Sequence, residues 1–230
     1  LGVMLLYAPI HYLLMEEIDF PIVMTSGNVS EEPICSDNEE ALEKLKGIAD
    51  VFLLNNRSIV NRIDDSVTSF NAGAERIIRR ARGYAPQPIL LKKEAKIPVF
   101  AAGGFYKNTF CMTKGRYAFI SHHIGDLDNE KAFNYYLEQI ERYKKLFRVE
   151  PEVVAHDMHP GYLSTQYAQS LGLYKVAVQH HHAHIASCMA EYELYKPLPG
   201  NELAIKKDIQ GSLRVYFRQD KFLQRFCRKS

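Results

Sequence analysis

The chain has 230 residues, of which 47% are hydrophobic and 24% charged, and its formal net charge is +2, which is typical of one large globular domain or two small ones. No stretch approaches the roughly 20 apolar residues of a membrane span, and residues 1–6 lack a secretory signal, so we expect a cytoplasmic protein with no membrane partner. The four cysteines form no Cys-x-x-Cys pair, so neither a zinc ribbon nor a disulfide framework is indicated, and we expect reduced thiols.

The first third of the chain alternates short apolar segments with polar loops. Residues 1–6, 20–25 and 51–54 are apolar and rich in branched side chains, so each is predicted to form a strand. A short helix is predicted to begin near Tyr12, and a second helix follows Asp37, a residue type that caps helix N-termini. Because strands alternate with helices, the pattern favours an α/β layer fold.

Three polar clusters follow these elements, at the places where α/β folds hold ligands: residues 26–30, 62–67 and 79–86. In the third cluster, Arg79, Arg80 and Arg82 stand within four positions and can hold phosphate oxygens through charge-assisted hydrogen bonds. Arginine runs are more often solvated surface, so the order of the three clusters carries more weight than any one of them.

Residues 101–109 are a candidate phosphate loop. Gly103 and Gly104 provide conformational freedom and backbone donors, Lys107 provides a cation, and Thr109 provides a hydroxyl. The alternative is an ordinary β-hairpin with turn glycines.

The next two predicted elements are a helix and a buried strand. Residues 129–147 have strong helical periodicity, and residues 153–155 form an apolar run that ends at His156, Asp157 and His159. These three side chains either support a metal, contact a substrate or form a structural turn. The helical stripe is assigned to the core and consists of Phe133, Tyr136, Leu137, Ile140, Tyr143 and Leu146.

Four histidines lie within five positions, and they are His180, His181, His182 and His184. If this run opens a helix, His180 and His184 lie one turn apart on one face and can share a metal ion. Clustered histidines also occur in solvated turns and on proton-sensitive surfaces. A metal site needs a further ligand, and two imidazoles suit zinc, iron and nickel alike.

Several of these segments resemble one known family. Residues 1–5, 25–30, 56–59, 62–67 and 79–86 resemble the C-terminal half of a YrdC-like domain, and the last two are similar to the branch found in the HypF family. Residues 107–111, 121–127, 155–165 and 178–184 resemble, in order, the first half of the HypF transferase domain, which is actin-like.

The resemblance implies an α/β chain in which the C-terminal part of a YrdC-like domain precedes the first part of an actin-like (ASKHA) ATPase domain. We expect the YrdC-like part over residues 1–92, the actin-like part over residues 96–196, and a divergent basic tail over residues 197–230. From Lys196 to the end, nine Lys and Arg stand against three Asp and Glu. A shifted reading frame would explain the tail, and we expect the chain to be a fragment.

The resemblance also implies an activity, the carbamoyltransferase reaction of nickel-iron hydrogenase maturation. The YrdC-like part would make carbamoyl-adenylate from carbamoyl phosphate and Mg-bound ATP. The actin-like part would transfer the carbamoyl group to the C-terminal cysteine of a maturation partner protein. This chain is expected to carry only part of that machinery.

Roles carried over from the family fall on three groups of residues. Nucleotide or carbamoyl contacts are expected from Ser26, Asn28 and Ser66, with Arg79 or Arg82 on phosphate. In the actin-like part, Lys107, Asn108 and Thr109 are expected to bind ATP, with Lys107 also catalytic. The histidines His180 and His184 are expected to be catalytic as ligands of a divalent metal, zinc or iron.

Two alternative functions are compatible with parts of the same sequence pattern. One is a tRNA threonylcarbamoyl-adenosine biosynthesis protein whose basic tail contacts RNA, in line with the double-stranded RNA binding known among YrdC-like proteins. Residues 80–86 and 159–165 argue against it because both resemble HypF. The other alternative is an inactive module that binds a metal or a nucleotide.

Overall fold

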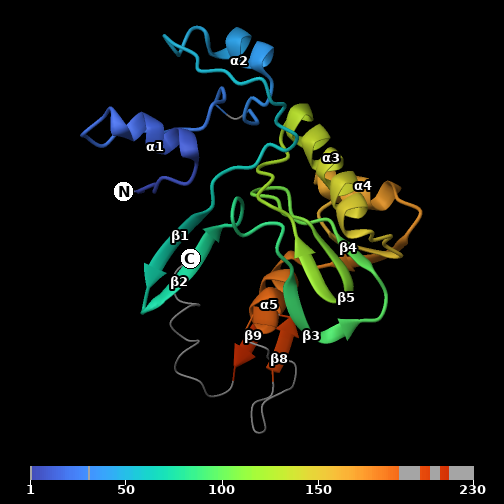
Figure 1. Cartoon of the computed structure of the whole chain (residues 1–230). Helices are drawn as coiled ribbons and strands as arrows, with labels where there is room; N and C mark the ends of the chain where they lie inside the picture. Colours follow the sequence, from blue (N-terminus) through green and yellow to red (C-terminus); the bar gives the residue numbers. More distant parts are fainter. Residues whose placement is uncertain (1, 31, 192–202, 208–212, 218–230) are drawn as a thin grey trace. The chain divides into compact units, whose positions relative to one another are not determined.

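The computed structural model describes residues 2–30, 32–191, 203–207 and 213–217 (Figure 1). It divides into two compact units, Leu1–Val60 and Asn61–Ser230. Most of the predicted tail, residues 197–230, lies outside the described residues. Within the tail, β8 (Leu203–Lys207) and β9 (Leu213–Phe217) pair as antiparallel strands.

The first unit contains the two predicted helices. Helix α1 (Pro9–Glu16) has a proline in its first turn, where no backbone donor is lost. Helix α2 (Asn38–Leu45) begins after Asp37, whose carboxylate accepts hydrogen bonds from the backbone N–H groups of Glu39 and Glu40. Helix α2 therefore begins where the capping residue predicted, whereas α1 begins at Pro9, earlier than the predicted start near Tyr12.

The strands predicted at residues 1–6, 20–25 and 51–54 are wrong for the described residues, which form no strand there. A strand needs a neighbour that satisfies its backbone donors and acceptors. No such neighbour forms within the described part of the first unit, and Val23 and Val51 stay 93% and 85% exposed. Apolar composition alone therefore did not decide the backbone conformation.

The second unit is built on a five-stranded mixed sheet in the order β3-β5-β4-β6-β7. Strands β4, β6 and β7 run parallel, whereas β5 is antiparallel to both β3 and β4. The bounds are β3 (Ile89–Ala95), β4 (Val99–Ala101), β5 (Cys111–Ile120), β6 (Val153–Asp157) and β7 (Tyr174–Val178), and a hairpin of β1 (Val67–Asn71) and β2 (Ala74–Arg79) precedes them.

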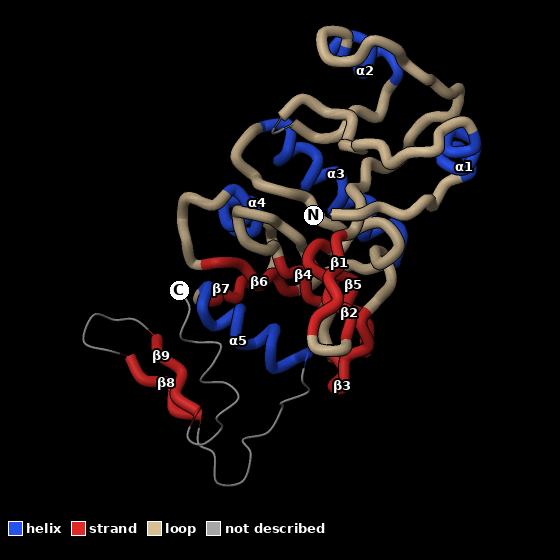
Figure 2. Tube along the Cα trace, turned by 90° about the vertical axis from the view of Figure 1, so that its left-hand side faces the viewer, coloured by secondary structure: helices blue, strands red, loops and turns tan. Residues whose placement is uncertain are grey.

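Three helices accompany this sheet: α3 (Glu130–Phe147), α4 (Leu163–Ser170) and α5 (His180–Glu191). Figure 2 shows α3 and α4 on one side of the row of strands and α5 on the other. The predicted helix over residues 129–147 and the predicted strand over 153–155 are confirmed, and the histidine run does open a helix. None of the described helices combines the length and the hydropathy needed to cross a bilayer.

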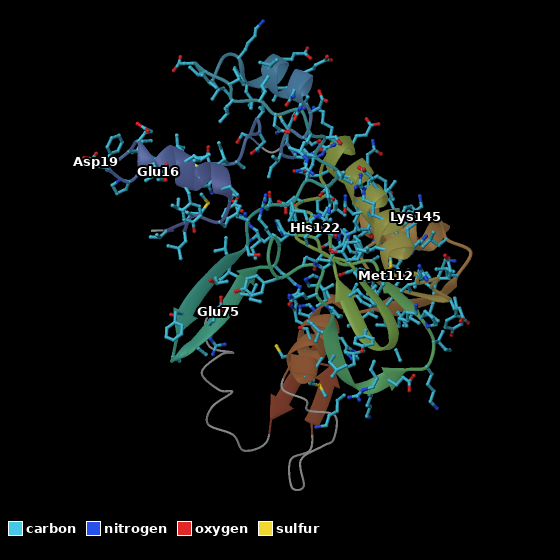
Figure 3. The ribbon with its side chains drawn as sticks, viewed as in Figure 1. Glu16, Asp19, Glu75, Met112, His122 and Lys145 are labelled. Atoms are coloured by element: carbon cyan, nitrogen blue, oxygen red, sulfur yellow. The ribbon has the colours of Figure 1, made fainter. Side chains whose placement is uncertain are left out.

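The core lies between the sheet and the helices α3 and α4. Phe100, Met112 and Val154 from the strands pack against Tyr136 and Ile140 of α3. Figure 3 shows Met112 and His122 in this interior, and both are at most 1% exposed.

The predicted stripe on α3 is largely right but fails in its last turn. Leu146 is 62% exposed, because Phe147 instead packs on the core by stacking its ring on Phe119, with centroids 3.9 Å apart. Tyr135 and Gln139 are buried although they were not assigned to the stripe. The buried face of α3 is therefore wider than the apolar stripe and includes these two polar side chains.

The cysteines are unpaired, as the spacing predicted, for the three that the structure describes: Cys35, Cys111 and Cys188. Burial raises the pKa of the Cys111 thiol to about 12. That thiol therefore stays protonated at neutral pH. Cys227 lies outside the described residues.

His122 is a buried histidine in a network of tyrosines. Its Nε2 lies 2.8 Å from the Tyr135 hydroxyl oxygen, and its backbone N–H donates to the Tyr143 hydroxyl at 3.2 Å. Burial, together with the neighbouring His123, lowers the pKa of His122 to about 4. The folded state therefore holds this ring in its neutral form.

Acid is expected to destabilise the second unit through His122. Its folded pKa lies below the unfolded value of 6.5, so the stabilisation is complete above about pH 6.5 and is lost as the pH falls towards 4. The full shift corresponds to about 3 kcal/mol. Urea unfolding of the wild type and of His122→Gln at pH 7.5 and pH 5 should show a smaller pH effect in the variant. If the wild type and His122→Gln lose the same unfolding free energy between pH 7.5 and pH 5, then His122 is not the source of the acid sensitivity.

Candidate functional site

A cavity of about 350 Å³ lies at the carboxyl ends of the three parallel strands. Its wall includes Ala101, Asp157 and Val178, which are the last residues of β4, β6 and β7. Open α/β sheets hold their ligands at this edge, because the loops that follow parallel strands converge there. The volume falls within the range of small-molecule sites.

The loop between β4 and β5 forms one side of the cavity, through Gly103, Gly104, Lys107 and Thr109 among others. Gly103 has φ +75°, and a Cβ atom added to it would lie 2.2 Å from the carbonyl oxygen of Thr109. Only glycine fits such a close backbone approach in the left-handed region. The candidate phosphate loop at residues 101–109 runs between the antiparallel strands β4 and β5, and Gly103 allows it to fold tightly beside the cavity. Its phosphate-binding role stays a prediction.

Asn108 does not line the cavity, and its expected role as an ATP contact stays a prediction. Its side chain is buried, and Nδ2 donates to the carbonyl oxygens of Ala102 at 3.2 Å and Gly104 at 2.6 Å. An amide committed to two carbonyl groups inside its own loop shapes that loop. The sequence could not separate this role from ligand binding, since both use a polar side chain beside glycines.

His180 and His184 converge on the opposite side of the cavity. Their Nε2 atoms lie 3.1 Å apart, and the two rings meet at 83° with centroids 4.7 Å apart. Both residues line the cavity, whereas His181 and His182 do not. The helical spacing therefore correctly predicted which two histidines of the run come together.

Asp157 fixes the orientation of His180. Its Oδ2 lies 2.7 Å from Nδ1 of His180, and its Oδ1 accepts a hydrogen bond from the backbone N–H of His159 at 2.9 Å. A carboxylate at Nδ1 favours the tautomer with its proton there, which leaves the Nε2 lone pair free and directed at His184. Of the roles left open for Asp157, support of the histidine pair is the one this geometry fits.

The donor set fits a divalent metal ion with an open coordination sphere. Two imidazole Nε2 atoms converge beside a cavity, and one ring is oriented by a carboxylate, as is usual for metal-ligating histidines. Within the described part of the chain, no group of three or more His, Cys, Asp or Glu side chains is placed to hold a metal. The described chain thus offers two ligands, and the metal itself remains a prediction.

Asparagine in place of Asp157 is expected to weaken metal binding. The amide removes the carboxylate charge that holds His180 at Nδ1 and orients its ring, and losses of about tenfold to a hundredfold are typical of such changes. Zinc titration by calorimetry of wild type, Asp157→Asn and the exposed control Asp128→Asn would measure the effect. Equal affinities in all three would remove Asp157 from the site.

The other predicted contacts lie outside this cavity. Ser26 donates to Asn28 Oδ1 at 2.5 Å in the first unit, where Asn28 Nδ2 donates to the carbonyl oxygens of Val29 and Glu32. A separate cavity of that unit, about 430 Å³, includes residues 55–59 in its lining, but neither Ser26 nor Asn28 lines it. Their roles as nucleotide or carbamoyl contacts stay predictions.

In the second unit, Ser66 and Arg82 link the segment at residues 65–66 to the segment at residues 81–82. Ser66 Oγ donates to the Arg82 carbonyl oxygen and accepts from the Ala81 N–H, both at 2.8 Å. Arg82 forms an ion pair with Asp65, Nε to Oδ1 at 3.3 Å, while the side chain of Arg79 is exposed. Phosphate binding by either arginine likewise stays a prediction.

Two family models match the chain in succession. A model described as telomere recombination, for the Sua5, YciO and YrdC proteins, matches residues 1–81, and the HypF Kae1-like domain matches residues 94–191. Together with the described sheet, these matches confirm the predicted α/β class, a YrdC-like part followed by an actin-like part.

Curated relatives agree with these matches. Carbamoyltransferase HypF of Synechocystis sp. is 46% identical over 191 residues, which are 83% of this chain and 25% of that protein. Carbamoyltransferase HypF2 of Cupriavidus necator is 42% identical over 221 residues, covering 87% of this chain and 27% of that protein. The chain spans about a quarter of the length of the curated relatives it matches.

Solved structures give the same result. The crystal structure of a full-length HypF in its phosphate- and nucleotide-bound form matches with a TM-score of 0.85 and 77% identity, covering 95% of this chain and 35% of that one. The crystal structure of T. kodakarensis HypF matches with a TM-score of 0.75 and 39% identity, covering 81% of this chain and 25% of that one.

Proposed function

The chain belongs to the HypF family, and on this premise we propose that its cavity acts in an ATP-dependent carbamoyl transfer of hydrogenase maturation. The substrates are carbamoyl phosphate and Mg-bound ATP, the activated species is carbamoyl-adenylate, and the acceptor is the C-terminal cysteine of a maturation partner protein. The observation that carries the proposal is that a glycine loop bearing Lys107 and a converged histidine pair line one cavity at the ends of parallel strands.

The loop after β4 serves the phosphate end of the nucleotide. Lys107 supplies a positive charge, Thr109 a hydroxyl, and Gly104, whose absent side chain would face His180 across the cavity, allows a phosphate to approach the backbone. In phosphate chemistry such groups stabilise charge that develops on the transferred or leaving oxygens. Lys107 is therefore the residue of this loop with a direct catalytic role.

The histidine pair acts on the carbamoyl end of carbamoyl-adenylate, where the transfer takes place. When bound by His180 and His184, zinc or iron would supply a positive charge that polarises the carbamoyl oxygen or holds a phosphate oxygen. Asp157 keeps the Nδ1 proton on His180, so that Nε2 stays available as a ligand. In the transfer itself the cysteine sulfur bonds to the carbamoyl carbon, the bond from that carbon to the adenylate oxygen breaks, and the thiol proton leaves to solvent.

The remaining family contacts are assigned to adenylate formation. Ser26, Asn28 and Ser66 contact the nucleotide or the carbamoyl group, with Arg79 or Arg82 on phosphate. Carbamoyl-adenylate hydrolyses readily in water, so an enclosed site raises the share that reaches the acceptor.

A transfer assay tests the proposal and its alternatives together. The chain is incubated with zinc and Mg-bound ATP in two mixtures. One contains carbamoyl phosphate and a peptide ending in cysteine, and the other contains threonine, bicarbonate and unmodified tRNA. A carbamoyl group on the peptide, detected by mass spectrometry, supports the proposal. A modified tRNA would favour the threonylcarbamoyl alternative. Binding of ATP and zinc without any transfer would favour the inactive module.

A further inference from the structure

Residues 124–127 are paired with the loop that carries Lys107. The Leu127 N–H donates to Phe105 O at 3.0 Å, the Asn108 N–H donates to Gly125 O at 2.8 Å, and the Ile124 N–H donates to Asn108 O at 2.9 Å. These three backbone hydrogen bonds fix the position of the loop against its neighbour. None of them involves the backbone N–H of Lys107.

The backbone N–H of Lys107 is instead bound by a side chain. It donates to Oδ1 of Asp126 at 2.6 Å, a charge-assisted hydrogen bond. Lys107 has φ +47°, in the left-handed region that residues with a Cβ atom rarely adopt. Such a conformation persists only where the surroundings over-determine it. The Asp126 carboxylate is a specific contact that stabilises it.

Asp126 is itself presented by an anchored segment. On its N-terminal side, the His123 N–H donates to Arg80 O at 2.8 Å, and His122 contacts Tyr135, whose hydroxyl donates to Arg62 O. On its C-terminal side, Leu127 is fully buried. The carboxylate therefore projects from a fixed backbone, as a group that positions another group must do.

We propose that Asp126 is a positioning residue that holds Lys107 in its left-handed conformation and so directs the lysine towards the cavity. The inference rests on the proposed function of the Lys107 loop and extends it to a residue that does not line the cavity. A positioning residue acts through another residue, so its loss should alter ligand affinity while the fold stays intact.

The test compares Asp126→Ala, Asp126→Asn and the control Asp128→Ala, an exposed acid two positions further on. Asn keeps an oxygen acceptor for the Lys107 N–H, whereas Ala removes it. Hydrogen exchange of the Lys107 amide, followed by NMR, should be about tenfold faster in Asp126→Ala than in wild type. Exchange in Asp126→Asn and in Asp128→Ala should stay within about threefold of wild type.

Titration with Mg-bound ATP supplies the functional readout. Asp126→Ala is expected to bind about tenfold more weakly than wild type, and Asp126→Asn should recover most of the loss. Unchanged exchange at Lys107 in Asp126→Ala would overturn the inference, and so would an affinity that Asn does not restore. If wild type binds no ATP while the exchange result holds, the proposed function fails and the structural role of Asp126 stands.

Discussion

The His184→Ala variant is expected to lose at least about a hundredfold in zinc affinity. In the described part of the chain, only His180 and His184 converge as paired imidazoles beside the cavity, with Nε2 atoms 3.1 Å apart. Removing one of two such ligands should cost more than the tenfold to hundredfold typical of a residue that only orients a ligand. Calorimetric zinc titration measures the loss of zinc affinity. The carbamoyl transfer assay then measures how far this loss lowers the transfer of the carbamoyl group to the peptide.

The matched control for this variant is His182→Ala. His182 belongs to the same run on α5 and is exposed, but it does not line the cavity. It should bind zinc as wild type does. If His182→Ala loses as much affinity as His184→Ala, then the histidine run binds metal as a flexible cluster, and the paired site is wrong.

A second large effect is expected from Gly103→Ala. The new methyl carbon would lie 2.2 Å from the carbonyl oxygen of Thr109 and 2.8 Å from Nδ2 of Asn108, in a backbone conformation of φ +75°. The left-handed conformation alone costs about 1–2 kcal/mol for alanine, and the clash with backbone adds to it. We expect the variant to lose about 3 kcal/mol of unfolding free energy or more, and to lose ATP binding.

Urea unfolding and ATP titration measure this loss, with Gly104→Ala as the stability control. A Cβ atom at Gly104 would meet its nearest neighbour, Cε1 of His180, at 3.8 Å, an ordinary contact distance. Gly104→Ala should therefore unfold at nearly the wild-type urea concentration. Equal unfolding curves for Gly103→Ala and Gly104→Ala would contradict the close approach of Gly103 to the Thr109 carbonyl group.

Local sequence signals predicted the second unit better than the first. Helix α3 and the strand at residues 153–155 follow from periodicity, because their apolar faces meet a sheet that the same unit provides. The apolar segments at residues 20–25 and 51–54 carry equally strong composition but form no strand. Strand formation depends on a partner elsewhere, and composition contains no information on whether that partner is present.

The candidate site shows the same division between local and non-local information. A separation of four residues on a helix was enough to predict that His180 and His184 meet. The contact between His180 and Asp157 joins the ends of the neighbouring strands β6 and β7, 23 residues apart in the sequence, so the sequence left three roles open for that aspartate. Asn108 and Asp126 support a loop through hydrogen bonds, and their residue types alone do not distinguish support from ligand contact.

The most direct test is a crystal structure of the chain grown with zinc and Mg-bound ATP, with anomalous diffraction recorded at the zinc edge. The account predicts one zinc peak bound by the Nε2 atoms of His180 and His184, with ATP phosphate density beside Lys107 in the same cavity. A zinc peak elsewhere, with the two imidazoles turned apart and no phosphate at the Lys107 loop, would contradict it.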